Sequence, residues 1–322
     1  MNQPLWMVAA ALLVSGMDAL AQAQAYPARP VRVIVPTAPG GGVDPFARMI
    51  SQSLSDQLKQ PFLVDTRPGA TGIIGTEIVA RAASDGHTLL FAWTAPLAIN
   101  PGLYAKLPYD VLRDFAPIIM PATTPNVIVV QPSSAIRTVK DLIDAARRAP
   151  GKLSFASSGV GGSSHLAAEL FAAMTNTSMT HVPYKATSTA VVDLIAGRVD
   201  VMFAAMAPAL PHVRGGRLRA IAVTTSNRSL ILPDLPIAAD AVPGYAADTW
   251  YGLLAPAGTS PAITGRLNQA VNAYLKEPGT APLLHQQGFE AVGGTAESFA
   301  AFLRTELVKW GKLIKQANIS PE

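Results

Sequence analysis

The feature that most constrains the fold of this 322-residue chain is its alternation between short apolar runs and amphipathic stretches. The run Val31–Val35 is typical of a buried strand, and the segment 46–58 that follows places its apolar residues on one helical face. Further strand-like runs, each with helical periodicity nearby, occur at 88–92, 152–157 and 199–203. Alternating strands and helices predict an α/β fold.

A long apolar stretch near the middle of the chain predicts two lobes rather than one. Residues 115–131 are apolar but interrupted by Pro121 and Pro125, which is typical of a strand that leaves one domain and enters another. The run 250–254 then predicts a return crossing. The interpretation gives a first lobe over 26–123, a second lobe over 124–245, and a return strand with C-terminal helices over 246–322 that complete the first lobe. Ligands of open α/β sheets bind beyond the carboxyl ends of the strands, so the cleft between the lobes is the expected site.

Several residues predict where helices begin. Thr138 and Asp141 form a capping-box pattern, and Ser260 precedes Pro261 as a serine cap followed by proline at the first helical position. Asp44 is the expected cap of the helix after the first strand.

The first 25 residues predict export. An apolar run over 6–14 is followed by two overlapping small-x-small patterns, which indicate a signal peptide cleaved near Ala23 or Ala25 and a periplasmic protein. Met1 to Pro4 carries no Lys or Arg, which departs from the usual pattern, and the alternative is an N-terminal helix of the folded domain. No cysteine follows the run, so we expect no lipid anchor.

Composition excludes several classes of site. The chain has no cysteine, which excludes disulfides, thiolate metal sites and a cysteine nucleophile. Its five histidines lack metal-ligand spacing, so we expect neither a metal nor a cofactor. The net charge is +4 and the basic residues are scattered, which argues against a nucleic-acid partner. We expect a monomer.

Two glycine-rich loops, each between a strand and a helix, are the candidate binding elements. In loop 36–44, three successive glycines let backbone N–H groups approach an anion at a helix N-terminus. The alternative is an ordinary tight turn.

The second loop, 157–164, has the same position before a helix and adds four hydroxyls to the exposed amides. The alternative is a solvated serine/glycine loop. Together the two loops could hold a carboxylate without any arginine.

Enzyme interpretations are weaker. The glycine spacings fit neither the dinucleotide fingerprint nor the nucleotide-triphosphate loop. Ser163, Ser164 and His165 suggest a hydrolase, but no G-x-S-x-G pattern surrounds them. A lone His165 is more often a packing or helix-start residue than a ligand.

Segments along nearly the whole mature chain resemble one family. They include PTAPGGGVDPFAR (36–48), RPGATGIIG (67–75), FASSGVGGSSHLAAELF (155–171) and HVPYK (181–185). Together they resemble the receptors of the tripartite tricarboxylate transporters, also called Bug receptors.

The resemblance implies the type II periplasmic-binding-protein fold, with two α/β lobes joined by crossing strands and a small carboxylated solute between them. It implies that both loops hold a ligand carboxylate. The residues it singles out are Pro39, Gly40, Gly41 and Asp44 in the first loop, and Ser157, Gly159, Gly162, Ser163 and Ser164 in the second. It also implies that Thr94, Ala95 and Tyr184 line the same cleft. The sequence departs from the family at Ala186, where glycine is usual, and at Ala204 and Ala205, where an acid is usual. The identity of the solute therefore stays open.

The expected function is capture of a mono- or dicarboxylate for the permease subunits of a tripartite tricarboxylate-type transporter, without catalysis. One alternative is a periplasmic metabolite sensor for a signalling partner. The other is a secreted serine hydrolase.

Overall fold

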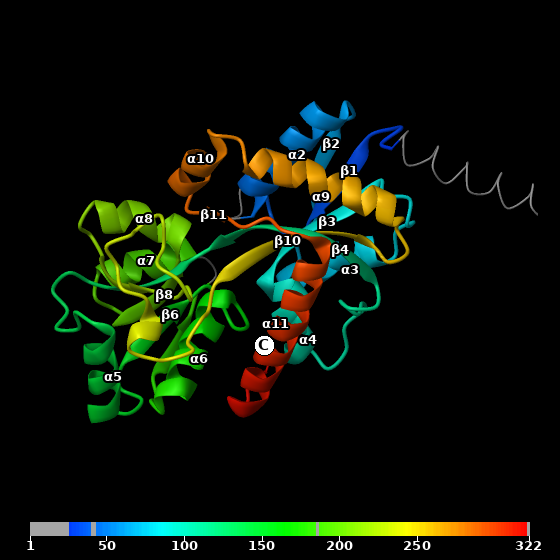
Figure 1. Ribbon diagram of the computed structural model, residues 1–322. Helices are drawn as coiled ribbons and strands as arrows, with labels where there is room; N and C mark the ends of the chain where they lie inside the picture. Colours follow the sequence, from blue (N-terminus) through cyan, green and yellow to red (C-terminus); the bar gives the residue numbers. More distant parts are fainter. Residues whose placement is uncertain (1–25, 40–42, 185–186, 321–322) are drawn as a thin grey trace, which may run out of the picture.

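The computed structural model describes residues 26–39, 43–184 and 187–320. The predicted signal peptide, residues 1–25, and the loop residues Gly40 and Gly41 lie outside these ranges. The strands form two separate sheets, each flanked by helices, and the molecule has two lobes (Figure 1). This arrangement confirms the predicted α/β fold.

The first sheet has six strands in the order β11-β4-β10-β3-β1-β2. β1 lies parallel to β2 and β3, whereas β10 runs antiparallel to β3 and β4. The valine-rich sequence of β1 suits a strand in the middle of a covered sheet. The strands are β1 (Val31–Val35), β2 (Phe62–Thr66), β3 (Thr88–Trp93), β4 (Phe115–Thr124), β10 (Thr249–Pro256) and β11 (Glu290–Ala291).

The helices packed with this sheet come from both ends of the chain. They are α2 (Asp44–Leu58), α3 (Ile73–Ala80), α4 (Asn100–Leu103), α9 (Pro261–Leu275), α10 (Thr280–Gln286) and α11 (Ala296–Gln316), with short turns η1 (Ala70–Gly72) and η2 (Ala95–Ile99). α9 begins as predicted, because the Ser260 hydroxyl accepts the N–H of Ala262. The cap predicted for α2 is wrong: Val43 is the cap, and Asp44 is the first helical residue, where its carboxylate pairs with Arg48 at 3.0 Å.

The second sheet has five strands in the order β7-β6-β8-β5-β9. β6 runs parallel to β7 and β8, and β5 runs antiparallel to β8 and β9. The strands are β5 (Asn126–Val130), β6 (Ser154–Ser157), β7 (Thr180–Pro183), β8 (Val201–Ala205) and β9 (Arg219–Val223). The helices are α5 (Val139–Arg148), α6 (Ser163–Thr175), α7 (Thr187–Ile195) and α8 (Met206–Arg214), with the short turn η3 (Ala238–Asp240). The capping box that opens α5 is present as predicted.

Two adjacent strands carry the chain between the sheets. β4 ends at Thr124, and β5 of the other sheet begins at Asn126, so Pro125 is the break between them. β10 runs back alongside β4, with Thr249 opposite Thr124 (Figure 1). The predicted crossing of the apolar stretch 115–131 is therefore observed.

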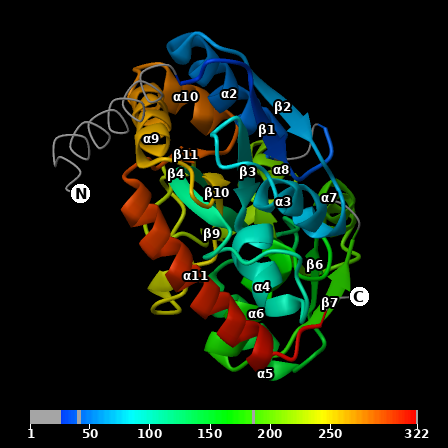
Figure 2. The same cartoon turned by 90° about the vertical axis from the view of Figure 1, so that its right-hand side faces the viewer.

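Helix α11 packs against both lobes. It contacts α4 and β4 of the first lobe and α6 of the second, and Figure 2 shows it running along the side of the molecule beside these helices. Glu306 of α11 is buried and accepts the indole N–H groups of Trp250 and Trp310, each at 2.8 Å, and it also pairs with Lys309. One apolar core includes side chains of both sheets, so the lobes are in contact here.

Candidate functional site

The loop between β6 and α6 is folded tightly around its own side chains. Gly159 and Gly161 have positive φ angles, of 116° and 73°, which favour glycine. The hydroxyl of Ser157 accepts the N–H of Gly159 at 3.1 Å, and the hydroxyl of Ser164 accepts the N–H of Ser158 at 3.0 Å. These hydrogen bonds fix the loop against the start of the helix.

The first turn of α6 carries the donors that remain for a ligand. α6 begins at Ser163, two residues earlier than predicted, with Gly162 as its cap. The N–H groups of a first helical turn have no intrahelical acceptor, and the helix dipole favours an anion beside them. Ser163, the first residue of the helix, is partly exposed.

Tyr184 lies beside this loop because β6 and β7 are parallel, with Ser157 opposite Pro183. The N–H of Tyr184 donates to the Ser157 carbonyl at 3.0 Å. Its phenol donates to the Asp193 carboxylate at 2.9 Å, and partial burial together with that carboxylate raises the pKa of Tyr184. The structure therefore brings together the predicted residues of the second lobe.

The described candidates of the first lobe, Pro39, Asp44, Thr94 and Ala95, follow β1 and β3, which are neighbours in the first sheet. Pro39 is exposed, and Asp44 is buried and paired with Arg48. Thr94 and Ala95 are buried, and the Thr94 hydroxyl accepts the N–H of Trp250 at 2.9 Å. Their role as cleft-lining residues stays a prediction.

A second loop of the first lobe, which the sequence did not single out as functional, supports the end of β1. Four successive residues, 69–72, have positive φ angles, and two of them, Ala70 and Thr71, are not glycine. The Asn100 side chain donates to the Thr71 carbonyl at 3.1 Å and holds this unusual backbone. A Cβ on Gly75 would lie 2.7 Å from the Pro36 side chain, so glycine is required where the following helix meets loop 36–44.

The two lobes touch at the second-lobe loop. A Cβ on Gly161 would lie 2.5 Å from the side chain of Leu103 on α4, so the loop backbone packs directly on the first lobe. A similar approach joins Gly288, before β11, to Ala207 on α8. Sequence patterns contain no signal for such contacts, because they depend on how the lobes are placed.

Two histidines lie behind the loop: the sequence interpretation treated His165 as a packing or helix-start residue and did not single out His181. The His165 and His181 rings stack with their centres 3.9 Å apart, and His181 Nε2 lies 2.6 Å from the Ser157 hydroxyl. Burial, with a smaller effect of His165, lowers the pKa of His181 to about 4. The available signal was their position, immediately after Ser164 and at the start of the HVPYK segment.

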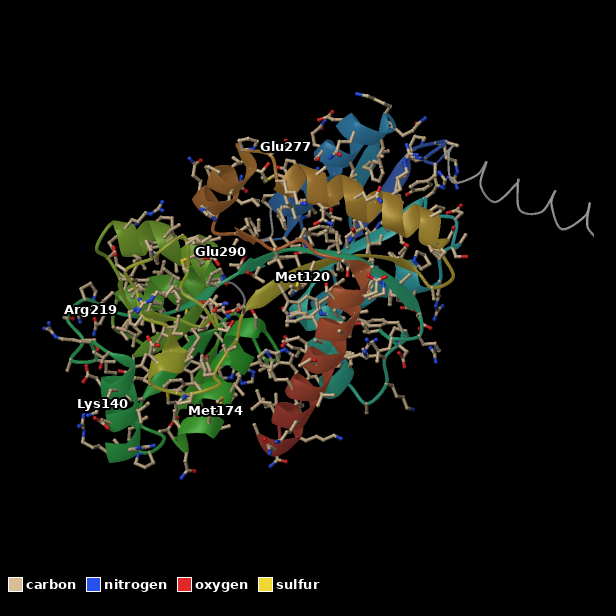
Figure 3. The ribbon with its side chains drawn as sticks, in the orientation of Figure 1. Met120, Lys140, Met174, Arg219, Glu277 and Glu290 are labelled. Carbon is tan, nitrogen blue, oxygen red and sulfur yellow. The ribbon has the colours of Figure 1, made fainter. Side chains whose placement is uncertain are left out.

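A separate cavity lies where the crossing strands meet α11. It has a volume of about 320 Å³ and includes Met120 of β4 and Glu290 of β11 in its wall (Figure 3). Asp248 and Glu306 also line it. Burial raises the pKa of Asp248 to about 7, against the effect of a hydrogen bond from Thr224. Of the predicted ligand-binding residues that the structure describes, none lines this cavity.

The residues with a described placement contain no group of three or more His, Cys, Asp or Glu side chains positioned to bind a metal ion. Within the same ranges, no helix has both the length and the apolar character that a bilayer crossing requires.

Comparison with known proteins gives consistent matches over most of the chain. The family described as the tripartite tricarboxylate transporter family receptor matches residues 46–319. BugT of Bordetella pertussis is 36% identical over 307 residues, which cover 95% of this chain and 94% of BugT.

Two solved structures are similar over the described fold. An R. palustris protein with adipate shares 36% identity and a TM-score of 0.81, covering 92% of this chain and 100% of that chain. The periplasmic binding protein BugD shares 30% identity and a TM-score of 0.77, with coverages of 92% and 100%. These likenesses confirm the predicted two-lobed periplasmic-binding-protein fold.

Proposed function

The chain belongs to the tripartite tricarboxylate transporter receptor family, and we propose that this solute receptor captures a small organic mono- or dicarboxylate between its lobes. The proposed lobes are 26–123 together with 246–322, and 124–245. The proposed ligand contacts are the two loops, with Thr94, Ala95 and Tyr184 beside them.

The single observation that carries the proposal is the construction of the α6 N-terminus. Loop 157–164 is braced by its own hydroxyls, and the first-turn amides of Ser163 and Ser164 have no acceptor inside the helix. Neither Lys nor Arg occurs in the loop. Oriented neutral donors at a helix N-terminus suit a carboxylate, because the dipole supplies positive potential without a counter-ion.

The solute class is supported by the R. palustris structure, whose ligand, adipate, has a carboxylate at each end. A dicarboxylate could contact both lobes at once, one end at α6 and the other at Pro39, Gly40 and Gly41. Binding in this way would favour lobe closure, because the closed form satisfies both charges.

We further propose that residues 1–25 direct export to the periplasm, and that the loaded receptor delivers its solute to the permease subunits of a tripartite tricarboxylate-type transporter. Family membership supports this partner. The role requires binding and release and no bond-breaking step. Within the described ranges, Ser157 is the one serine whose side chain is hydrogen-bonded to a histidine, and it is fully buried.

A thermal-shift screen of the mature protein, residues 26–322, tests the function. The ligands are acetate, malate, adipate and citrate, with adipamide as the neutral analogue of adipate. A native-state ligand at a hundredfold excess over Kd adds about 2.7 kcal/mol to the free energy of unfolding. We expect one class of carboxylate to raise Tm by several degrees and adipamide to have no effect.

Ser163→Asp and its neutral control Ser163→Asn locate the binding site. Aspartate is favourable in a first helical turn, so the variant should fold, but its charge should repel a bound carboxylate and abolish the shift. Ser163→Asn should keep most of it. A shift with adipamide and with none of the acids would overturn the carboxylate proposal.

A further inference from the structure

Three aromatic rings form a stack behind the candidate carboxylate loop. His181 of β7 lies between Phe155 of β6, at 4.8 Å between ring centres, and His165 of α6, at 3.9 Å. The rings are nearly parallel, with interplanar angles of 17° and 13°. Both histidines contact the loop through ring nitrogens, so the stack connects the sheet to the loop.

The contact of His165 defines its hydrogen-bonding state. The N–H of Gly161 donates to His165 Nδ1 at 3.2 Å, so Nδ1 carries no proton in this arrangement. The ring proton is then on Nε2, which lies 3.6 Å from the Glu169 carboxylate one helical turn away. Glu169 thus favours the tautomer that accepts from Gly161.

The contact of His181 acts on the other end of the loop. The Ser157 hydroxyl accepts the N–H of Gly159, and its oxygen lies 2.6 Å from His181 Nε2 and 3.2 Å from the Gly159 carbonyl. A separation of 2.6 Å fits an O–H donor and is shorter than the usual range for an N–H donor, so we assign the hydroxyl hydrogen to His181 Nε2, which then acts as an acceptor.

Protonation would therefore act against both contacts. A proton on His165 Nδ1 would face the N–H of Gly161, and a proton on His181 Nε2 would compete with the Ser157 hydroxyl hydrogen. The charges that act on His181 are those of His165, which disfavours a second positive ring, and Glu169, which favours it. Burial also favours the neutral ring.

We propose that His165 and His181 are positioning residues whose neutral rings hold loop 157–164 in the form that presents its donors to the solute carboxylate. The inference rests on the proposed function for its link to the solute, while the holding of the loop can be measured without any ligand. The rings act through Gly161 and Ser157, and they do not touch the solute themselves.

The first test is amide hydrogen exchange of the ligand-free mature protein at pH 7.5. His181→Phe keeps the ring stack but lacks the acceptor, and His181→Gln places a carbonyl oxygen near the Nε2 position. We expect exchange of the peptide covering 158–164 to rise at least tenfold in His181→Phe and less than threefold in His181→Gln. His165→Leu and His165→Asn form the matched pair for the Gly161 contact, with the same expectation.

The second test measures adipate binding by calorimetry from pH 7.5 to pH 4, so that the range reaches the pKa of His181. We expect His181→Phe to weaken binding about tenfold at pH 7.5, and His181→Gln to remain within threefold of the wild type. As pH falls, wild-type affinity should drop relative to the doubly substituted His165→Asn, His181→Gln protein, which shares every effect of adipate ionisation but lacks both imidazoles.

Each outcome decides a different point. Equal loop exchange in His181→Phe and His181→Gln would overturn the positioning role, whatever the ligand does. Parallel pH profiles for the wild type and the double variant would overturn the requirement for neutral rings. Failure of the wild type to bind adipate or any other tested acid would overturn the proposed function, and the exchange results would still stand.

Discussion

The carboxyl ends of the two sheets are stabilised by different chemistry. In the first lobe, Thr94 and Asn100 are fully buried, neutral, and bonded to Trp250 and Thr71, which lie 156 and 29 residues away. In the second lobe, Ser157 and Ser164 bond within the loop itself, and two imidazoles complete the network. One half of the candidate site is therefore fixed by long-range packing and the other by a local network that can titrate.

This difference indicates which half of the candidate site can respond to a change in pH. The contacts that Thr94 and Asn100 make with Trp250 and Thr71 contain no ionisable group, so pH should leave them unchanged over the physiological range. The second-lobe contacts include the neutral ring of His181 and should weaken as pH falls towards its pKa of about 4. Movement of the lobes also has different effects: the first-lobe contacts lie within one sheet region, whereas Gly161 of the second-lobe loop meets Leu103 across the interface.

The largest loss of stability should come from replacing Glu306 of α11, which is hydrogen-bonded to Trp250 of the crossing strand β10. Glu306→Ala leaves two buried indole N–H groups and Lys309 without their common acceptor. Breaking a buried ion pair in this way typically costs about 3–5 kcal/mol of folding free energy. Urea unfolding measures the loss. Glu306→Gln keeps an oxygen acceptor for the indoles and should lose clearly less; equal losses would mean that the hydrogen bonds contribute little.

A first-lobe change should be large and independent of pH. Thr94→Val preserves shape but leaves the buried N–H of Trp250 without its hydroxyl acceptor, at a cost of about 1–3 kcal/mol. Unfolding measured at pH 5.5 and pH 8 should give the same difference from the wild type at both. A difference that changes with pH would break the contrast between the two lobes.

A second-lobe change should depend on pH. The pKa of His181 is about 4 in the folded protein and about 6.5 when unfolded, so the unfolded state binds more protons between these values. Stability should therefore fall as pH drops from 6.5 towards 4, by about 1–2 kcal/mol once the partial solvent access of the ring is allowed for. His181→Gln should remove this slope in urea titrations, and an unchanged slope would assign it to other groups.

The smallest effect should be a gain in stability, and it should come from replacing Asp248, the residue just before the crossing strand β10. The pKa of Asp248 is raised to about 7, so the folded state holds the proton more tightly than the unfolded state. Its contribution is complete below about pH 4 and is lost as pH rises through 7. Asp248→Asn should therefore be more stable than the wild type at pH 8 by about 1 kcal/mol, and similar to it near pH 4. Loss of stability at pH 8 would show that the carboxylate is needed in its charged form.

Sequence patterns predicted the elements well where the signal was local. The capping box at Thr138 and the serine cap at Ser260 both open helices as expected, and Pro125 marks the passage between sheets. The prediction that Asp44 caps α2 was wrong. A carboxylate just before an apolar helical face fits the first helical position as well as the cap position, and the ion pair with Arg48 favours the first helical position. The two Gly-rich loops remain predictions as ligand sites.

By itself, the sequence determined the alternation of strands and helices, the family, and the donor chemistry of loop 157–164, because each is expressed by neighbouring residues. Only the tertiary structure decided that His165 stacks on His181 and that the Thr94 hydroxyl accepts the backbone N–H of Trp250. It also decided that Glu306 accepts two indole N–H groups and pairs with Lys309. These contacts join residues on different strands and helices. Their energies depend on register, burial and lobe placement, and no local periodicity in the sequence records those quantities.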